Sequence, residues 1–413
     1  MIGRGVGVLR PLTLALMVAF GPGLLAVRSE PVAIAVPDSQ LERVDWRELP
    51  GWAADDHAAA FDAFLSSCRA IVARKQPVRD ARAIDAPLAD ICREALLLGP
   101  ARASEARAFF ESRFRPVRIA KLGETEGFLT GYYEPVVEGS RFPTQQFTVP
   151  MYRRPDDLIS PVREAGMGFP NKGGAFRMTG NQQRLPYYER AEIEDGALDG
   201  KGLEICWLKD PIDAFFIQIQ GSARIRLEDG AMLRLNYAAH NGHPYTPVGA
   251  LLAQRGEVPK EEMSMDRIRD WMLAKPGDGK ELRRQNRSFV FFRVAELADH
   301  EEAIGGQGIP LTAGRSIAVD RRLHAYGTPF WIDAELPLSA ETGKDRFRKL
   351  MIAQDTGSAI VGPARADIYF GAGPEAGRVA GRIKHPGRFV MLVPRSLELV
   401  TRPVPYPRPR PKS

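Results

Sequence analysis

The sequence predicts a mainly β protein with helices at its N-terminal end, an α+β chain. Three observations support this fold class. Between about residues 39 and 118, apolar residues recur at three- and four-residue spacing, the period of an amphipathic helix. From Gly127 onward, short apolar segments alternate with glycine and proline, which is typical of strands joined by turns. From Pro310 to the segment GRFVMLVPR, such strands follow one another closely and predict a compact barrel.

The size and charge of the chain exclude some functions. With 413 residues, it has enough material for two domains with separate cores, and a monomer is expected. A formal net charge of +6 is mild for this length and favours weak attraction to a polyanionic surface. No basic helix with interleaved aromatic residues stands out, so nucleic acid is not an expected partner.

Residues 1–35 are interpreted as an export signal. Two arginines precede the apolar run Pro11–Phe20, and a Gly-Pro-Gly break and small residues follow. Cleavage near Ala26 or Ala35 and retention as an uncleaved anchor all stay open. No cysteine lies near a plausible cleavage point, so no lipoprotein anchor is indicated. A periplasmic location is expected, with peripheral outer-membrane or cell-wall association left open.

Export would place the three cysteines in an oxidising compartment, which favours disulfide formation. Cys68 and Cys92 lie in the helical region on either side of a linker that contains proline and arginine. A disulfide that joins two helices is our hypothesis. Cys206 lies in a strand-like run and is predicted to be a buried free thiol.

Two carboxylates stand out near the C-terminal end, in the segment Lys349–Gly371. Asp355 and Asp367 end two predicted strands that a Gly-rich turn joins. A carboxylate where a strand gives way to glycine is held rigidly and faces an opening, as catalytic acids do. The alternative, that each aspartate only caps a turn, stays open. The Asp-Thr-Gly triplet at 355–357 resembles an aspartic-protease motif, but the chain has no second copy, so a protease is not favoured.

Uncharged polar and aromatic residues predict a carbohydrate surface in three segments, around residues 132–134, 217–226 and 236–242. The run Tyr132-Tyr133-Glu134 joins two aromatic rings to a carboxylate at a strand end. A second run, residues 217–226, is predicted as a strand with one polar face. The candidate substrate-binding residues are Tyr132, Tyr133, Glu134, Gln218, Gln220, Gly221, Ser222, Tyr237, Asn241, Thr356 and Gly357. The alternative is that these residues form ordinary solvated strand faces.

No metal or cofactor is expected. His240 and His243 have the spacing of a paired-histidine ligand set, but Gly242 and Pro244 oppose the helix that would place both rings on one face.

Several motifs occur in order between about Leu41 and Pro394, and together they resemble the membrane-bound lytic murein transglycosylase A (MltA) family with its C-terminal three-aspartate (3D) domain. These motifs are GYYEP, DPIDAFFIQIQGSARI, YAAHNGHPY, MSMDRIRDW, NRSFVFF, SIAVD, AQDTGSAIVG and ADIYFGAG. The resemblance implies a double-psi β-barrel with a second β-barrel inserted, and a substrate groove between them. The expected catalytic domain is 36–147 plus 287–398, the inserted domain 148–286, and a disordered Pro/Arg-rich tail 399–413.

The resemblance also implies an activity and its residues. The expected reaction is cleavage of the β-1,4 bond between N-acetylmuramic acid and N-acetylglucosamine in peptidoglycan, which leaves 1,6-anhydromuramoyl ends. Asp367 would act as acid and then base, Asp355 and Asp213 would support it, and Asp320 would be structural. An inverting glycoside hydrolase and a non-catalytic cell-wall binding protein stay open as alternatives.

Overall fold

The structure is a computed structural model that describes Gly3 and residues 33–74, 82–160, 174–340 and 343–399. The predicted tail after residue 399, and the predicted export signal apart from Gly3 and its last three residues, lie outside these ranges. No helix in the described ranges is long and apolar enough to cross a membrane.

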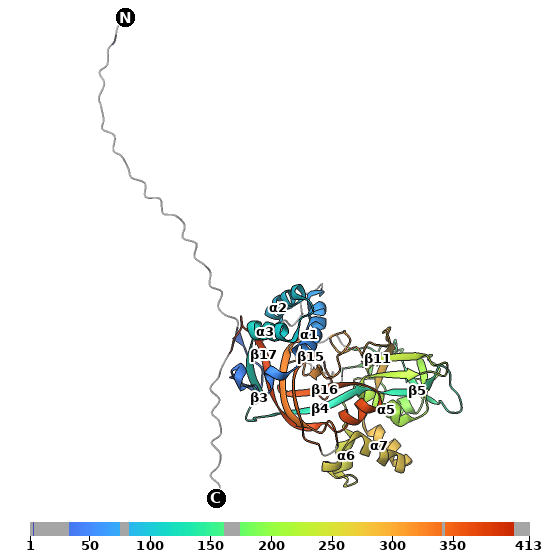
Figure 1. Cartoon of the computed structure of the whole chain (residues 1–413). Helices are drawn as coiled ribbons and strands as arrows, with labels where there is room; N and C mark the ends of the chain where they lie inside the picture. Colours follow the sequence, from blue (N-terminus) through green and yellow to red (C-terminus); the bar gives the residue numbers. More distant parts are fainter. Residues whose placement is uncertain (1–2, 4–32, 75–81, 161–173, 341–342, 400–413) are drawn as a thin grey trace. The chain divides into compact units, whose positions relative to one another are not determined.

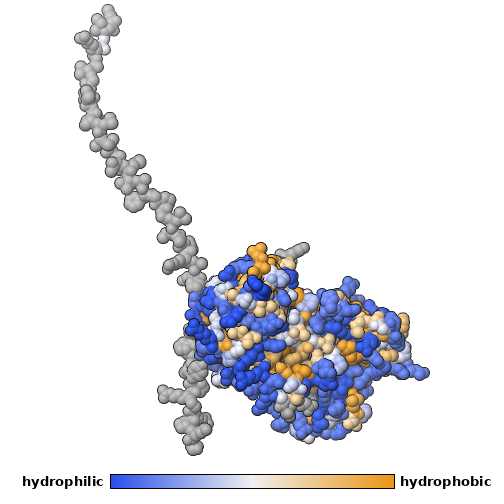
Figure 2. All heavy atoms as spheres, viewed as in Figure 1, coloured by the Kyte–Doolittle hydropathy of each residue, from blue (hydrophilic) through white to orange (hydrophobic). Residues whose placement is uncertain are grey.

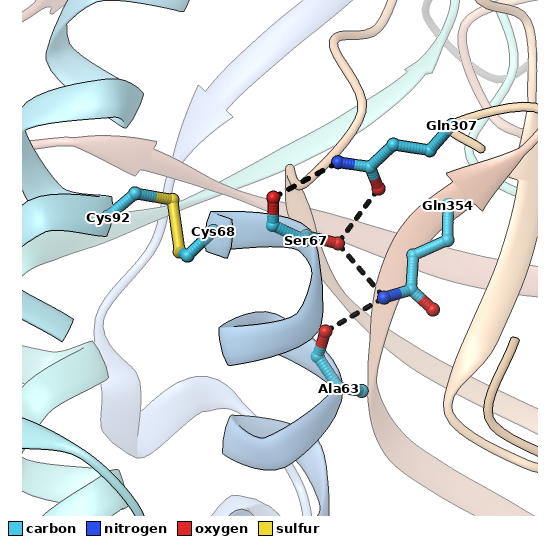
Figure 3. Close-up of a disulfide and its surroundings, with 6 residues drawn as sticks. All are labelled: Ala63, Ser67, Cys68, Cys92, Gln307 and Gln354. Atoms are coloured by element: carbon cyan, nitrogen blue, oxygen red, sulfur yellow. Dashed lines mark hydrogen bonds between the residues drawn. A yellow bond between two sulfur atoms is a disulfide. The ribbon is translucent and has the colours of Figure 1, made fainter. Parts of the chain in front are cut away.

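Three α-helices form the N-terminal end of the folded chain (Figure 1): α1, His57–Val72; α2, Asp85–Leu98; and α3, Ala103–Arg113. α1 begins after Asp56, whose carboxylate caps it by accepting a hydrogen bond from the Ala59 N–H. The predicted disulfide between Cys68 and Cys92 is confirmed, and it joins α1 to α2 (Figure 3). Cys206 is a buried free thiol, as predicted.

The predicted barrel is confirmed as a closed ring of six strands in the described part of the chain. In ring order the strands are β14 (Pro329–Leu336), β15 (Asp345–Asp355), β13 (Ser316–Val319), β16 (Arg365–Ala372), β4 (Gly127–Glu134) and β17 (Lys384–Pro394). Pairing of β14 with β17 closes the ring. The β13–β15 and β16–β4 pairs are parallel, and the others are antiparallel. Closure removes the exposed edges of these strands.

A second six-stranded sheet follows directly from β4. Its order is β12 (Val290–Val294), β11 (Met232–His240), β10 (Ser222–Arg226), β5 (Val136–Ser140), β9 (Glu204–Leu208) and β6 (Val149–Tyr152). A bridge between Arg153, just after β6, and Phe292 of β12 links the two edges, so the sheet curls into the second barrel. Two of its strands lie outside the expected limits 148–286, and we propose 136–294 for this domain.

The predicted strand over residues 217–226 is wrong for its first part. Pro211–Gln220 form a helix, α5, and only Ser222–Arg226 are strand. The helix begins because the Asp210 carboxylate accepts a hydrogen bond from the Ile212 N–H, with proline at the first helical position. It ends at Gly221, whose φ of +84° is the left-handed conformation that glycine favours.

The remaining elements surround the two barrels. β2 (Ser39–Arg43) and β3 (Phe114–Lys121) extend the first sheet beyond β17, and β1 (Ala33–Ile34) pairs with β18 (Glu398–Leu399). β7 (Phe176–Met178) and β8 (Arg184–Pro186) form a hairpin. The other α-helices are α4 (Arg190–Glu194), α6 (Val248–Gln254), α7 (Met265–Ala274), α8 (Pro276–Gln285) and α9 (Gly373–Ala380). Short 3-10 helices span Trp46–Glu48, Trp52–Ala54 and Lys260–Glu262. The visible face is mostly hydrophilic, with apolar patches near α2 (Figure 2).

Candidate active site

The strand register brings the two predicted carboxylates to one level of the first barrel. β13 lies between β15 and β16, and its Ala318 is the partner of both Asp355 and Asp367. Directly paired residues project to the same side of a sheet, so the two carboxylates share a face. Thr130 of β4 is the next partner of Asp367 and extends the row. Ile317 belongs to the main core, whereas Ala318 lies in a separate small cluster with Tyr132 and Tyr369, so the row is on the face of the sheet opposite Ile317.

Three donors hold the Asp355 carboxylate. Its Oδ1 accepts hydrogen bonds from the backbone N–H of Gly306 at 2.7 Å and of Thr356 at 2.8 Å. Its Oδ2 accepts one from the Tyr132 hydroxyl at 2.8 Å. Burial raises the pKa of Asp355 to about 6; these hydrogen bonds act against the rise, and the nearby charge of Asp367 adds to it. The Asp355 carboxyl group therefore changes from its protonated to its ionised form at about pH 6.

Asp367 is anchored by fewer groups. Its Oδ1 accepts a hydrogen bond from the Thr130 hydroxyl at 2.6 Å, and the Arg365 guanidinium donates to that hydroxyl at 2.8 Å. Its Oδ2 has no hydrogen-bond partner among the described residues. Burial raises the pKa of Asp367, while the charge of Arg365 and the Thr130 hydrogen bond act in the opposite direction. This carboxyl group is therefore suited to hold a proton on a free oxygen.

A cavity of about 380 Å³ opens beside the Asp355 end of the row, with walls from both barrels. Asp355 lines it, as do eight predicted substrate-binding residues: Tyr132, Gln218, Gln220, Gly221, Ser222, Tyr237, Thr356 and Gly357. Asp367 lies two strands from Asp355, outside the lining. Amide and hydroxyl groups beside tyrosine rings suit a sugar, which offers hydroxyl groups and apolar ring faces.

A larger cavity, of about 620 Å³, lies within the inserted barrel. Two of its charged lining residues, Arg190 and Glu194, form an ion pair. Asp355 lines the smaller cavity and not this one, so we assign the chemistry to the smaller cavity.

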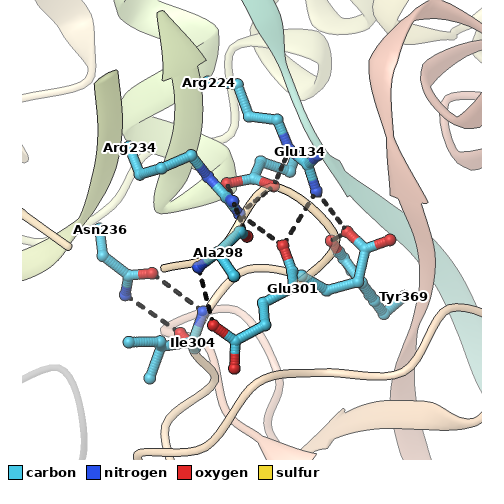
Figure 4. A network of polar contacts seen from close by, with 9 residues as sticks. Glu134, Arg224, Arg234, Asn236, Ala298, Glu301, Ile304 and Tyr369 are labelled. Atoms are coloured by element: carbon cyan, nitrogen blue, oxygen red, sulfur yellow. Dashed lines mark hydrogen bonds and ion pairs between the residues drawn. The ribbon is translucent and has the colours of Figure 1, made fainter. Parts of the chain in front are cut away.

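Glu134, one of the predicted binding residues, does not line this cavity. Its side chain is 1% exposed and accepts hydrogen bonds from Arg224 at 2.7 Å and Arg234 at 3.1 Å (Figure 4). Arg224 also pairs with Glu302, which accepts a hydrogen bond from the Tyr369 hydroxyl. Because Glu134 is the last residue of β4, just before the inserted sheet, this network ties the two barrels together.

Asn241 also lies away from the cavity lining. It is fully buried, and its amide group donates to the carbonyls of Tyr188 and Arg287 at 2.9 Å each. The side-chain oxygen accepts from the Phe289 N–H at 2.9 Å. These contacts bind three loop segments together, which is a structural role.

Asp213 and Tyr133 are likewise outside the cavity lining. The Asp213 carboxylate pairs with the Arg269 guanidinium of α7 at 2.6 Å. The Tyr133 N–H donates to the Gln220 side chain at 3.1 Å, and its ring packs against Gly377 of α9, where a Cβ would lie 2.8 Å from a ring carbon. Asp213 thus holds α5 to α7, and Tyr133 holds the barrel to α9.

Several residues of the site were not predicted. Thr130 and Arg365 flank Asp367, and Arg321 and His240 line the cavity. Gly306 donates to Asp355 from a loop far away in sequence. The glycine-rich segment 305–308 was a usable signal, because glycines mark a close approach of the backbone. No local sequence pattern predicted Thr130, Arg365, Arg321 or His240 as residues of this site.

Comparisons with known proteins agree with this architecture. Residues 128–293 match the model of the MltA specific insert domain, and residues 315–393 match that of the 3D domain. The crystal structure of a membrane-bound lytic murein transglycosylase from Agrobacterium tumefaciens is 37% identical; the match covers 86% of this chain and 98% of that one, with a TM-score of 0.77.

Two Escherichia coli comparisons add to this. Membrane-bound lytic murein transglycosylase A of strain K12 is 38% identical over 268 residues, which is 64% of this chain and 64% of the length of that relative. E. coli MltA with bound chitohexaose has a TM-score of 0.62 and 28% identity, covering 89% of this chain and 96% of that one. The fold and the site define a two-barrel protein with a 3D domain. The chain belongs to the MltA family.

We predict that Tyr132→Phe raises the pKa of Asp355 above about 6. The hydroxyl donor favours the ionised carboxylate, so its removal favours the protonated form. The measurement is an NMR titration of aspartate carboxyl carbons, with the signal assigned by its absence in Asp355→Asn. Tyr133→Phe, which removes a hydroxyl one residue later, is the control and leaves the titration unchanged. An unchanged or lowered pKa in Tyr132→Phe would contradict the assignment.

Proposed function

We propose that this protein is a lytic transglycosylase that acts on the glycan strands of peptidoglycan. The observation that carries the proposal is the row of two carboxyl groups with raised pKa values beside a cavity of uncharged polar and tyrosine side chains. The relatives are named for this activity, and the chitohexaose bound to E. coli MltA is a β-linked amino-sugar chain. No cofactor or metal is needed for the proposed reaction.

The proposed reaction needs one acid and no water. Asp367, protonated on its free Oδ2, donates a proton to the glycosidic oxygen as the bond to C1 of N-acetylmuramic acid breaks. The resulting carboxylate then accepts the proton of the C6 hydroxyl of the same sugar as that oxygen attacks C1. The products are a free C4 hydroxyl on N-acetylglucosamine and a 1,6-anhydromuramoyl end, and Asp367 is protonated again.

Asp355 supports this step in our proposal. Its charge lies close enough to Asp367 to affect ionisation, and three donors fix its position. An ionised Asp355 would favour the protonated form of Asp367 and would stabilise positive charge that develops at C1. Asp213, held by Arg269, is proposed to stabilise the inserted barrel and not to take part in the reaction.

A location at the cell wall follows from the substrate. We propose that the protein works in the periplasm, where peptidoglycan lies. Its relatives are named as membrane-bound, so association with a membrane surface is part of the proposal.

Digestion of purified peptidoglycan sacculi tests the activity. We expect soluble products whose muramic acid ends are in the 1,6-anhydro form, as measured by mass spectrometry. Products heavier by one water would identify a hydrolase with a second carboxylate as base. Sacculi that bind the protein but release nothing would identify a binding protein. Either of the last two results would overturn the proposal.

We predict that Asp367→Asn lowers the turnover of sacculi by at least about 100-fold, because the amide can neither donate nor accept the required proton. Binding of sacculi, measured by co-sedimentation, stays within a few-fold of wild type. Asp333→Asn is the matched control: Asp333 is on β14, paired with Arg348 and outside the row, and its variant keeps its turnover. Near-normal turnover of Asp367→Asn would contradict the role of this residue.

Wild-type turnover falls as the pH rises through the pKa of Asp367, since only the protonated form can act as the acid. This loss begins at a higher pH than for an ordinary aspartate, because burial raises that pKa. A pH–rate profile that is still rising well above pH 8 would contradict an acid of this kind.

A further inference from the structure

Gln354, the residue just before Asp355, has no part in the proposed reaction. In the pairing of β13 with β15, Ile317 is opposite Ala353 and Ala318 is opposite Asp355, so Gln354 is the extra residue of a β-bulge. Bulges next to active sites redirect side chains. Here the Gln354 side chain is fully buried, while Asp355 occupies the outward position in the row.

The buried Gln354 amide contacts helix α1 (Figure 3). Its Nε2 donates to the Ala63 carbonyl at 2.8 Å and to the Ser67 hydroxyl at 2.9 Å. Its Oε1 accepts from the Ser316 hydroxyl of β13. Every polar atom of this amide is therefore satisfied, and the bulge is fixed to both β13 and α1.

Ser67 also forms hydrogen bonds to the loop that contains Gln307. Its hydroxyl donates to Gln307 Oε1 at 2.9 Å, and Gln307 Nε2 donates back to the Ser67 carbonyl at 3.2 Å. The Gln307 N–H also donates to the Gln354 carbonyl at 3.0 Å. Ser67, Gln307 and Gln354 thus form a closed ring of hydrogen bonds. Figure 3 shows the bonds of Ser67 to Gln307 and to Gln354, with the disulfide residue Cys68 next to Ser67.

The loop held by this ring carries a donor to Asp355. Gly306 precedes Gln307, and its N–H lies 2.7 Å from Asp355 Oδ1. The loop is close to its neighbours: a Cβ on Gly306 would lie 2.6 Å from the Tyr326 hydroxyl oxygen, and one on Gly305 would lie 2.7 Å from the Gln354 carbonyl oxygen. A small displacement of the loop would therefore change the hydrogen bond to Asp355.

We propose that Ser67, Gln307 and Gln354 are positioning residues that hold the Gly306 N–H against the Asp355 carboxylate and so set the ionisation of the site. They act on Asp355 through a helix and a loop that are distant from it in sequence. Their effect on turnover rests on the proposed function, whereas their effect on the ionisation of Asp355 does not.

Other groups also act on Asp355. Tyr132 from β4 and the Thr356 N–H donate to it, and Asp367 from β16 opposes its ionisation. Arg321 and His240 line the same cavity. The proposed substitutions leave all of these side chains unchanged, so a shift in Asp355 would report the Gly306 donor.

The test uses Ser67→Ala and Gln307→Ala in the full chain, with the aspartate carboxyl carbons followed by NMR. The expected result is an Asp355 titration midpoint about one pH unit above wild type in each variant, the size expected when one N–H to carboxylate hydrogen bond is lost. The double variant shifts no further than either single one, because both break the same ring. The pH–rate profile of turnover on sacculi shifts in the same variants.

Ser66→Ala is the matched control, because the neighbouring hydroxyl donates only to the Asp62 carbonyl of its own helix. Its titration midpoint equals that of wild type. Gln307→Ala changes only the loop side of the ring, so it tests the proposal even where Ser67→Ala fails to fold. A folded Gln307→Ala variant with an unchanged Asp355 midpoint would overturn the inference. A wild-type protein that releases no anhydro products would overturn the proposed function and leave this inference standing.

Discussion

The site depends on the position of β13 between the two strands that carry the carboxylates. Ala318 pairs with Asp355 on one side and with Asp367 on the other, so a short strand sets the level and the face of both groups. The bulge at Gln354 is part of this arrangement, because it leaves Asp355 opposite Ala318. Closure of the barrel prevents these strands from sliding, since each has a partner on both sides.

The two carboxyl groups differ because their donors differ. Burial raises the pKa of both, but Asp355 accepts three hydrogen bonds and Asp367 accepts one. Hydrogen bonds to a carboxylate favour its charged form, so three donors act against the rise at Asp355, whereas one hydrogen bond and the charge of Arg365 act against it at Asp367. A single acid–base group beside a fixed companion is what an internal nucleophile on the substrate requires, because no water has to be activated.

Much of the fold followed from local patterns in the sequence. The helical N-terminal region, the Cys68–Cys92 disulfide and the C-terminal barrel strands were all predicted. The helix α5 was missed, although Asp210-Pro211 and Gly221 are its start and stop signals, because alternating isoleucines also fit a strand.

The site was predicted less completely, for a physical reason. Asp355, Asp367 and Tyr132 carry local signals, since each is a polar residue in an apolar strand. Glu134 carries the same signal, yet Arg224 and Arg234 from distant strands occupy its oxygens. Thr130 and Gly306 become partners of the carboxylates only when the barrel closes, and no periodicity in the sequence reports such contacts.

The central claim is that one aspartate cleaves the glycan without water, and digestion of sacculi in water enriched in ¹⁸O tests it most directly. We predict that the new muramic acid ends contain no ¹⁸O, because the oxygen that attacks C1 comes from the C6 hydroxyl of the same sugar. One ¹⁸O atom per cleaved bond would contradict the account, since it would mean that water is the nucleophile and that a second carboxylate activates it.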